Sequence, residues 1–496
     1  GGFGFGIDID GDGDCDYFVF VEGKISLDDT TDYGGVTIIF ERYDPTEESY
    51  TVYSDSVGYF SGQFLPGIYN IHFEKLGWKP MILYEQYLLW EDTDIGTITM
   101  EIGFALDVFG EVYGVWTNLY DYYVTADIKV PVDSTLTIGP GVNVLFTGYY
   151  NFIVEGTIIA EGTENDSIFF TSSQPVPDKS DWGSIKLHSV SNIFRYVQYE
   201  YADNGITGHD DISGSIFENC TITNIPQFQE GTGEGRLSCH GIGVGHDANY
   251  YNCDNCIFNH NVIDADLYHG IMINGSAKNV QITNNTINIY GMGIQIEGQN
   301  YHDYPDSSTI SFNTISLEQS NYYGIEVNNC ANCLFEENTI LSPNGGGLES
   351  QYSSNVTIIN NIIEAGGNNN KAIYASYSDS AKITDNNIIT TGDGIYANSS
   401  NNAQILFNTI IANSDGVNID YSSGSKIADN DIRGTTSKAI RFNNAENVVI
   451  ENNFINPYSG YAIYNSDNSC PTDSTTSFCF ASHNNQIIDN HIEYQS

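Results

Sequence analysis

Residues 282–287, Ile-Thr-Asn-Asn-Thr-Ile, carry the phrase that decides the fold: an apolar residue, two free positions, Asn, one free position and Ile. The phrase returns along the chain with 22 to 28 residues between successive Asn positions. These positions are Asn285, Asn313, Asn338, Asn361, Asn386, Asn408, Asn430 and Asn453. A nearly constant period of this size indicates a repeat architecture in which each period is one structural unit.

A second pattern repeats with the same period: a small residue followed by an aliphatic residue, which we call the aliphatic mark. It occurs at Gly270-Ile271, Gly293-Ile294, Gly324-Ile325, Gly347-Leu348, Ala372-Ile373, Gly394-Ile395, Gly416-Val417, Ala439-Ile440 and Ala462-Ile463. The units show no helical periodicity, and Asn, Ser, Gly and Asp separate their short apolar runs. One unit cannot bury its apolar side alone, so each strand must pair with its equivalent in the next turn. The sequence therefore predicts an all-β parallel β-helix.

This array resembles the right-handed parallel β-helix proteins with pectate-lyase-like coils, which implies a right-handed solenoid over residues 133–496. The segment Leu136–Gly141 is similar to the entry coils of secreted bacterial β-helix proteins. We expect a structural role for the recurring Asn, because Asn tolerates the left-handed conformation and its amide can bond to the Asn of the next turn.

Two further segments precede the predicted solenoid. Residues 17–103 alternate apolar and polar with frequent turn signals, which predicts a small β-sandwich. Phrases such as Gly23-Lys24-Ile25 and Leu65-Pro66-Gly67 resemble the carboxypeptidase-regulatory-like module, which implies a non-catalytic spacer. Residues 104–132, rich in Tyr and Trp, are interpreted as a bridge.

Residues 1–16 combine Gly and Phe with alternating acidic residues: Asp8, Asp10, Asp12, Asp14 and Asp16. Several carboxylates can converge on one hard cation while Gly11 and Gly13 allow a tight bend, so we expect calcium here. The stretch looks similar to the Asp-rich loops of thrombospondin-type and FG-GAP-like extracellular repeats. The alternative is a solvated acidic turn. Phe3 and Phe5 are candidates for an assembly tail that adds to a groove on a neighbouring subunit.

The charge of the chain excludes several classes of partner. Lys and Arg number 16 and Asp and Glu 64, so 16 − 64 gives −48. Such a chain is a poor ligand for nucleic acid or an anionic membrane surface, and it repels acidic polysaccharide unless cations intervene. We also find no apolar run of about 18 residues, and so predict no membrane span. The sequence starts at Gly1 and shows no signal peptide, so we expect a mature protein secreted to the extracellular space or cell surface.

Nine cysteines suggest an oxidising compartment. Cys253 with Cys256, and Cys330 with Cys333, have zinc-like spacing. Their register places them three turns apart, or roughly 14 Å, too far for one zinc ion. Local disulfides or buried thiols are expected instead. Further disulfide candidates flank two insertions: Cys220 with Cys239, and Cys470 with Cys479. Cys15 is left over, and an odd cysteine can pair between molecules.

If the solenoid is catalytic, its site is predicted in coils 205–306, where six of the ten histidines fall. The candidate acid, base or metal-binding residues are His209, Asp210, Asp211, Arg236, His246, Asp247, Tyr268 and His269. The competing interpretation is that they are polar turn residues. Signatures implied by known catalytic β-helices, such as an Arg or Lys base beside a carboxylate cage, are absent. The sequence thus favours a non-catalytic protein, with a polysaccharide lyase or glycoside hydrolase as the alternative.

A column of residues should point outward beside the inward aliphatic mark. It includes Tyr374, Tyr396, Arg441 and Tyr464, which are candidates for a glycan or partner face. Ordinary cross-strand pairing on a solvated face is the alternative. Since the sequence ends on a strand without an amphipathic cap, we also expect self-association. The favoured function is a calcium-binding structural or adhesive surface protein, a subunit of an extracellular assembly or filament, with a non-catalytic glycan-binding adhesin as a further alternative.

Overall fold

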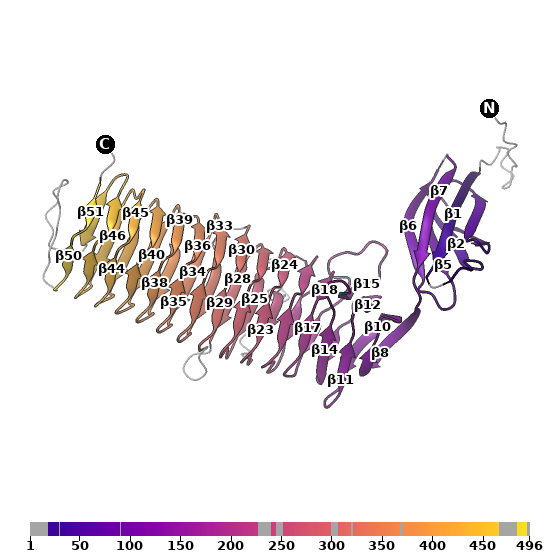
Figure 1. The fold of residues 1–496 in the computed structure, drawn as a ribbon, viewed down its shortest axis with the longest axis horizontal. Coiled ribbons are helices and arrows are strands. Elements are labelled where there is room, and N and C mark those ends of the chain that lie inside the picture. The colour runs from indigo at the N-terminus through magenta and orange to yellow at the C-terminus, as the bar shows by residue number, and fades with distance from the viewer. Residues whose placement is uncertain are drawn as a thin grey trace.

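The computed structural model describes residues 18–28, 30–89, 91–226, 240–244, 251–298, 306–318, 321–367, 371–465 and 484–493. All regular structure in these residues is β-strand. A small pair of sheets lies at one end of a long solenoid, whose last coil lies at the opposite end (Figure 1). Among the described residues, no helix has the length and apolar character needed to cross a membrane. The Asp-rich segment with Asp8 to Asp16, the tail with Phe3 and Phe5, and Cys15 lie outside the described residues.

Two small sheets form the N-terminal unit, in the strand orders β4-β1-β7 and β3-β2-β5-β6. Their strands are β1 Val19–Leu27, β2 Thr37–Asp44, β3 Glu48–Tyr53, β4 Tyr59–Phe64, β5 Gly67–Glu74, β6 Met81–Leu88 and β7 Thr93–Met100. Alternating residues such as Val19, Val21 and Ile25 are fully buried and form a core separate from that of the solenoid. The arrangement fits the predicted β-sandwich.

The solenoid begins earlier than residue 133. Strand β8 (Phe104–Glu111) already pairs in parallel with β10 (Tyr120–Val130), and β9 (Gly114–Trp116) pairs with the next coil. The segment interpreted as a bridge therefore supplies the first coil. Lys79 of the sandwich reaches Asp121 of β10 at 3.0 Å, with both side chains largely buried. This ion pair joins the sandwich to the first coil.

Each later coil contributes one strand to each of three parallel sheets. Sheet 1 continues from the end of β10 and contains β13 Phe152–Val154, β16 Ile185–Leu187, β19 Ile206–Gly208, β22 His240–Val244, β25 His269–Asn274, β28 Met292–Glu297, β31 Tyr323–Asn328, β34 Gly346–Gln351, β37 Lys371–Ser376, β40 Asp393–Asn398, β43 Val417–Asp420, β46 Lys438–Asn443 and β49 Tyr461–Asn465. Sheet 2 has 15 strands: β9, β11 Thr135–Ile138, β14 Thr157–Glu161, β17 Ile193–Arg195, β20 Ile216–Glu218, β23 Ile257–Asn259, β26 Gln281–Thr283, β29 Thr309–Ser311, β32 Leu334–Glu336, β35 Thr357–Ile359, β38 Lys382–Thr384, β41 Gln404–Leu406, β44 Lys426–Ala428, β47 Val449–Glu451 and β50 Gln486–Ile488. Sheet 3 contains β8, β10, β12 Asn143–Phe146, β15 Ile168–Ser172, β18 Val197–Glu200, β21 Thr221–Thr223, β24 Val262–Ala265, β27 Thr286–Ile289, β30 Thr314–Leu317, β33 Thr339–Ser342, β36 Ile362–Ala365, β39 Asn387–Thr390, β42 Thr409–Ala412, β45 Asp431–Arg433, β48 Phe454–Asn456 and β51 His491–Ile492.

The repeat phrase spans the corner between sheets 2 and 3. Its first apolar residue, such as Ile282, lies in sheet 2 and its last, such as Ile287, in sheet 3, and both are fully buried. Equivalent residues of successive coils stand in register, so Ile282 pairs with Ile310. Sheet 1 completes the core with the aliphatic mark, for example Ile271. The predicted right-handed parallel β-helix is confirmed.

The Asn of each phrase forms the predicted ladder. In every step from Asn261 to Asn490, Nδ2 donates to Oδ1 of the next coil's Asn at 2.9–3.0 Å. The same Oδ1 accepts the backbone N–H of the previous coil's Asn at 3.0–3.1 Å. These amides therefore satisfy buried backbone groups at a corner where no strand can do so.

The expectation that the ladder Asn adopts the left-handed conformation was wrong. The left-handed conformation falls on the residue before it, for example Asn284 (φ 57°), Phe312 (φ 57°) and Glu337 (φ 52°). Residues as different as Phe and Glu occupy that position, because the geometry of the corner imposes the conformation. The ladder Asn is selected for its amide alone.

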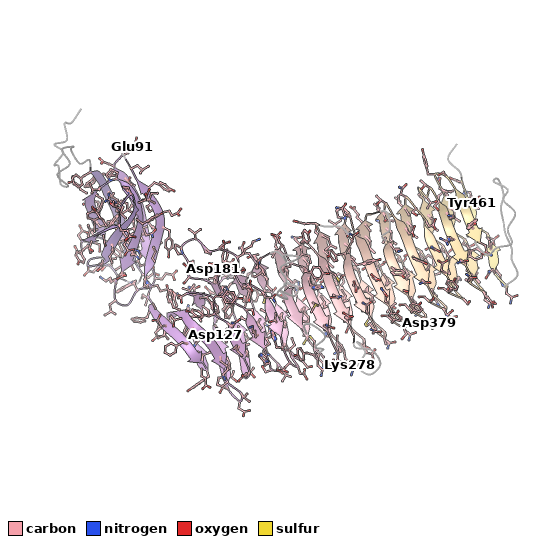
Figure 2. All side chains as sticks on the ribbon, turned by 180° about the vertical axis from the view of Figure 1, so that it is seen from behind. Glu91, Asp127, Asp181, Lys278, Asp379 and Tyr461 are labelled. Carbon is pink, nitrogen blue, oxygen red and sulfur yellow. A yellow bond between two sulfur atoms is a disulfide. The ribbon has the colours of Figure 1, made fainter. Side chains whose placement is uncertain are left out.

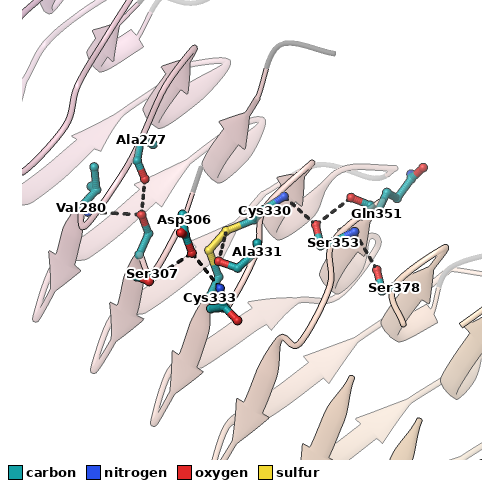
Figure 3. Close-up of a disulfide and its surroundings, with 12 residues drawn as sticks. Ala277, Val280, Asp306, Ser307, Cys330, Ala331, Cys333, Gln351, Ser353 and Ser378 are labelled. Carbon is teal, nitrogen blue, oxygen red and sulfur yellow. Dashed lines mark hydrogen bonds between the residues drawn. A yellow bond between two sulfur atoms is a disulfide. The ribbon is translucent and has the colours of Figure 1, made fainter. Parts of the chain in front are cut away.

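A second buried corner, between sheets 1 and 2, holds Cys253, Cys256, Cys330 and Cys333. Cys330 and Cys333 form a disulfide, and the backbone N–H of Cys330 donates to Ser353 Oγ at 3.0 Å (Figure 3). Ser353, Ser378, Ser400 and Ser422 continue this position in later coils through similar bonds. Cys253 and Cys256 are buried free thiols in this corner, and Cys220 is a buried free thiol at the ladder position, where its backbone N–H donates to Asn261 Oδ1 at 3.0 Å. The pairs 253/256 and 330/333 precede β23 and β32, which are three coils apart as predicted. Cys239, Cys470 and Cys479 lie outside the described residues.

Replacing Asn361 with Ala tests the ladder. Asn361 Nδ2 donates to Phe335 O, Ile359 O and Asn386 Oδ1, and its Oδ1 accepts from Asn338. The variant leaves several buried groups without partners, so we expect a loss of roughly 3 kcal/mol in the free energy of unfolding by urea titration. The control is Asn360→Gly at the left-handed position (φ 58°), which should cost little. Equal losses in both variants would contradict the ladder's role.

Candidate functional site

Two residues from the predicted catalytic set, His209 and Asp210, lie near a small cavity beside sheet 1. Lys186, Tyr149, Asp203 and His209 line this cavity, whose volume is about 190 Å³. His209 Nε2 lies 3.0 Å from Thr207 Oγ1, and its ring stacks on His188 at 5.4 Å. Asp210 Oδ2 is 2.8 Å from His188 Nδ1. Asp211 accepts the backbone N–H of Ser213 at 2.9 Å, within its own turn.

Tyr268 and His269 pack against each other and against neighbouring side chains. His269 is 4% exposed, and burial lowers the pKa of its imidazole to about 3 despite a hydrogen bond with Gln295. Tyr268 meets the imidazole edge-on at 4.4 Å and contacts Tyr322 at 5.1 Å. A histidine that stays neutral near pH 7 is a poor general acid. Arg236, His246 and Asp247 lie outside the described residues.

Of the histidine candidates, the two that the structure describes do not lie together. His209 follows β19 and His269 begins β25, which are two coils apart in sheet 1. No group of three or more His, Cys, Asp or Glu side chains in the described part of the chain is arranged to hold a metal ion.

The outward column of sheet 1 is continuous over much of the solenoid. We define the outer face by Lys186, Thr207, Gly243, Met272, Gln295, Glu326, Glu349, Tyr374, Tyr396, Asn418, Arg441 and Tyr464, each in register with the next. Met272 is buried but does not join the solenoid core, as expected for the outward side. The His209 cavity and the predicted glycan face are therefore parts of one surface, which extends toward Tyr461 at the end opposite the sandwich (Figure 2).

The tyrosines of this face stack on one another. Tyr374 and Tyr396 lie 5.4 Å apart in adjacent coils, with Lys371 Nζ at 5.2 and 5.6 Å from their ring centres. Further along, Tyr464 packs on Tyr461 at 5.1 Å. One face of each Tyr374 and Tyr396 ring is therefore occupied within the protein. Sugars can therefore stack only on the ring faces of these tyrosines that other side chains leave uncovered.

Glu326 and Glu349 lie side by side on the outer face. Neither residue was among the catalytic residues predicted from the sequence. Burial raises the pKa of both carboxyl groups, that of Glu349 to about 7, with the charge of Glu326 adding to the effect on Glu349. Glu326 Oε1 accepts from Asn328 Nδ2 at 2.9 Å, and Glu349 Oε1 accepts from Gln351. In the sequence, the only feature that marks Glu326 and Glu349 is that each directly follows an inward-pointing aliphatic residue. Their burial could not be predicted, because it depends on the side chains that neighbouring coils place beside them.

Replacing Glu349 with Gln should change the pH dependence of stability. A raised pKa means that the folded state holds the proton more tightly than the unfolded chain, so stability is lost as pH rises from about 4.5 to about 7. The variant should have a higher free energy of unfolding at pH 8, by on the order of 3 kcal/mol, and little change at pH 4. Glu364→Gln, at an exposed position of β36, is the control. An equal effect of Glu349→Gln at both pH values would contradict the buried-carboxyl account.

Comparison with known proteins bears on the fold. The family model described as "Right handed beta helix region" matches residues 303–414 and 367–495. No curated protein matches the chain. Among solved structures, a mannuronan C-5 epimerase A-module from Azotobacter vinelandii is 11% identical, with TM-score 0.41 and coverage of 73% of this chain and 91% of that chain. A DFA-IIIase from Arthrobacter chlorophenolicus is 13% identical, with TM-score 0.39 and coverage of 64% and 83%.

A type II cohesin–X-dockerin complex from Acetivibrio cellulolyticus is 23% identical, with TM-score 0.15, over 17% of this chain. The match spans 58% of that chain. The family-model matches, together with the parallel sheets, establish a right-handed parallel β-helix as the fold of the main part of this chain.

Proposed function

We propose that this chain is a glycan-binding solenoid that holds a polysaccharide strand along its outer face. The observation that supports this best is the unbroken register of outward positions from Lys186 to Tyr464, in which every residue from Gln295 to Tyr464 is aromatic, amide or charged. Its twelve positions span about 50 Å at about 4.8 Å per coil. A flat row of this length suits an extended chain better than a compact small molecule, which requires an enclosing pocket.

The chemistry of the outer face suits sugars. Glycans present hydroxyl groups that both donate and accept hydrogen bonds, and the amide and carboxyl groups of Gln295, Glu326 and Asn418 match them. Tyrosine rings add apolar contact area with a polar tip. This face is therefore proposed as adhesive in the first instance, without catalysis.

We extend the proposal to the setting of the protein. It is a secreted or surface-displayed subunit that associates with its own kind, and calcium bound by Asp8 to Asp16 supports that association. Exposed Tyr352, Tyr377 and Tyr421 repeat along one turn edge and offer apolar area to a neighbouring rod. Negative-stain microscopy with and without a calcium chelator tests this: filaments that disperse on chelation are expected, and single rods in both conditions would contradict it.

A second candidate function is hydrolysis of the bound glycan. The positions of Glu349 and Glu326 on adjacent strands resemble those of the two catalytic carboxyl groups of a glycosidase. Strand spacing separates them by about 4.8 Å, near the roughly 5–5.5 Å of retaining glycosidases. Protonated Glu349 would donate to the leaving oxygen, Glu326 would attack the anomeric carbon, and water would then release the sugar. Reducing ends should appear below pH 7 and vanish in Glu349→Gln. Absence of products from a broad glycan panel would remove this candidate.

Binding is tested by replacing Tyr374, Tyr396 and Tyr464 together with Ala. Loss of three aromatic contacts should weaken binding at least tenfold on a glycan array and in affinity electrophoresis. The matched control is the double Ala variant of Phe312 and Phe407, which are exposed at the corner between sheets 2 and 3 and not on the outer face. Unchanged binding in the first variant, or equal loss in the second, would exclude the outer face as the glycan site.

A further inference from the structure

The first coil of the solenoid leaves one strand edge open. Among the described strands, β8 stands in register with β10 and with no other strand. Seven of its eight residues are exposed. An edge strand carries unpaired backbone N–H and C=O groups, which make it a template for a further strand. The free edge of β8 is therefore a place where another segment can pair.

The end of the core is uncovered at the same edge. Phe104 and Leu106 stand in register with Tyr120 and Tyr122, on the side of β8 that faces the core. They are nevertheless 38% and 42% exposed, whereas Tyr122 in the next coil is 3% exposed. An inward side chain is fully covered only when a coil lies on both sides of it. A strand added to β8 would bury these two side chains, which favours its binding.

The N-terminal segment has the pattern that such an edge requires. Residues 3–10, which lie outside the described residues, read Phe-Gly-Phe-Gly-Ile-Asp-Ile-Asp. Phe and Ile occupy every odd position, and Gly and Asp occupy every even one. Strict alternation of this kind is typical of a strand that buries one side. The segment also equals β8 in length, at eight residues.

A parallel register, which continues the direction of the coils, matches this segment to β8 in order. Its apolar side chains then cover the inner side of β8. Ile9 lies beside Gly110, where an added Cβ meets no heavy atom within 4 Å, so there is room for the larger side chain. On the outer side Asp107 lies beside a glycine, and only the last pair, Asp10 and Glu111, brings two carboxylates together. The register therefore suits both sides of the strand.

The reach of the chain decides which copy supplies the segment. Strand β1 begins at Val19, and its other end pairs with Met100, shortly before β8 begins. At about 3.3 Å per residue, β1 spans about 26 Å and β8 about 23 Å. Because β8 leads away from the sandwich (Figure 1), Asp10 at its far end would lie at least about 35 Å from Val19, the value for two strands that meet at a right angle. The chain from Asp10 to Val19 reaches at most about 32 Å. The same chain therefore cannot supply the strand in this register.

We propose that residues 3–10 of one chain add as a parallel strand to the open edge of β8 in a second copy. Main-chain pairing supplies the attachment, and the alternate apolar side chains supply the fit to the end of the core. This inference rests on the proposed self-association and names its interface. Donor and acceptor are different surfaces of the same chain, so each copy that receives a strand can donate its own to the next, and the contact propagates.

Two variants of the full chain separate the donor from the acceptor. The donor variant replaces Phe3, Phe5 and Ile7 with Ser, and the acceptor variant is Leu106→Asp. In sedimentation velocity with calcium present, the wild type should associate as its concentration rises, and each variant alone should associate at least tenfold more weakly. An equimolar mixture should form a heterodimer and nothing larger, because only one donor and one acceptor remain intact. The control is Val176→Asp, at a position 65% exposed in the turn after β15, which should associate as the wild type does.

A peptide of residues 1–12 provides a second readout, in fluorescence anisotropy with the full-length donor variant, whose edge is intact. The peptide should bind this variant. A peptide of the same composition, in which Phe3 is exchanged with Gly4 and Ile7 with Asp8, should bind at least tenfold more weakly because its alternation is broken. The acceptor variant, with its melting temperature as a check on folding, should lose the binding to a similar extent.

Each contrary outcome has a distinct meaning. Association of either variant at the wild-type level, or equal binding of the two peptides, would overturn the β8 interface and leave self-association through another surface intact. A wild type that stays single while the donor variant binds the peptide would place the chain's own segment on the edge and overturn the second copy. A wild type that stays single and a donor variant that binds no peptide would reject the proposed self-association as well.

Discussion

The ladder of asparagine amides is the interaction on which the rest of the solenoid depends. At the corner between sheets 2 and 3 the chain turns too sharply for strand pairing, and the backbone groups there face the interior. The side chain of one Asn per coil satisfies its own coil and both neighbours. Since every coil needs the same amide at the same place, the coils are locked in register, and the isoleucine columns follow from that register.

Strict register has a consequence for the exterior. A residue that points outward in one coil lies directly beside its equivalent in the next coil. Side chains of one kind therefore form columns along the solenoid rather than compact clusters. Tyr374 and Tyr396 stack for this reason, and Glu326 and Glu349 come together for the same reason. A solenoid therefore produces long binding rows from single substitutions per repeat, without any change in its core.

Several polar side chains of the outer face are buried, whereas the polar side chains at the turns are mostly exposed. Carboxyl groups there hold protons more tightly than in water, and Asn418 Oδ1 and Arg441 Nε are buried without a hydrogen-bond partner within the protein. Such groups reduce the stability of the protein. The stability of the rod comes from the core, which lies on the inner side of the sheet 1 strands, and from the ladder, which lies at the corner between sheets 2 and 3.

Local periodicity in the sequence determined the parallel coil, the inward columns and the ladder, because every repeat has the same residues at the same positions and neighbouring coils differ little. The right hand of the coil was implied by the resemblance to the β-helix proteins. The sandwich was also predicted, from alternation within single strands. Tertiary structure alone decided that the corner geometry puts the left-handed conformation on residues such as Asn284, that Cys330 and Cys333 are joined while Cys253 and Cys256 are not, and that residues 104–132 already coil. It also decided that His269 is buried and neutral while Glu349 keeps its proton to about pH 7. Burial, pairing and pKa depend on which side chains the adjacent coils bring alongside, and those neighbours are more than twenty residues away in the chain.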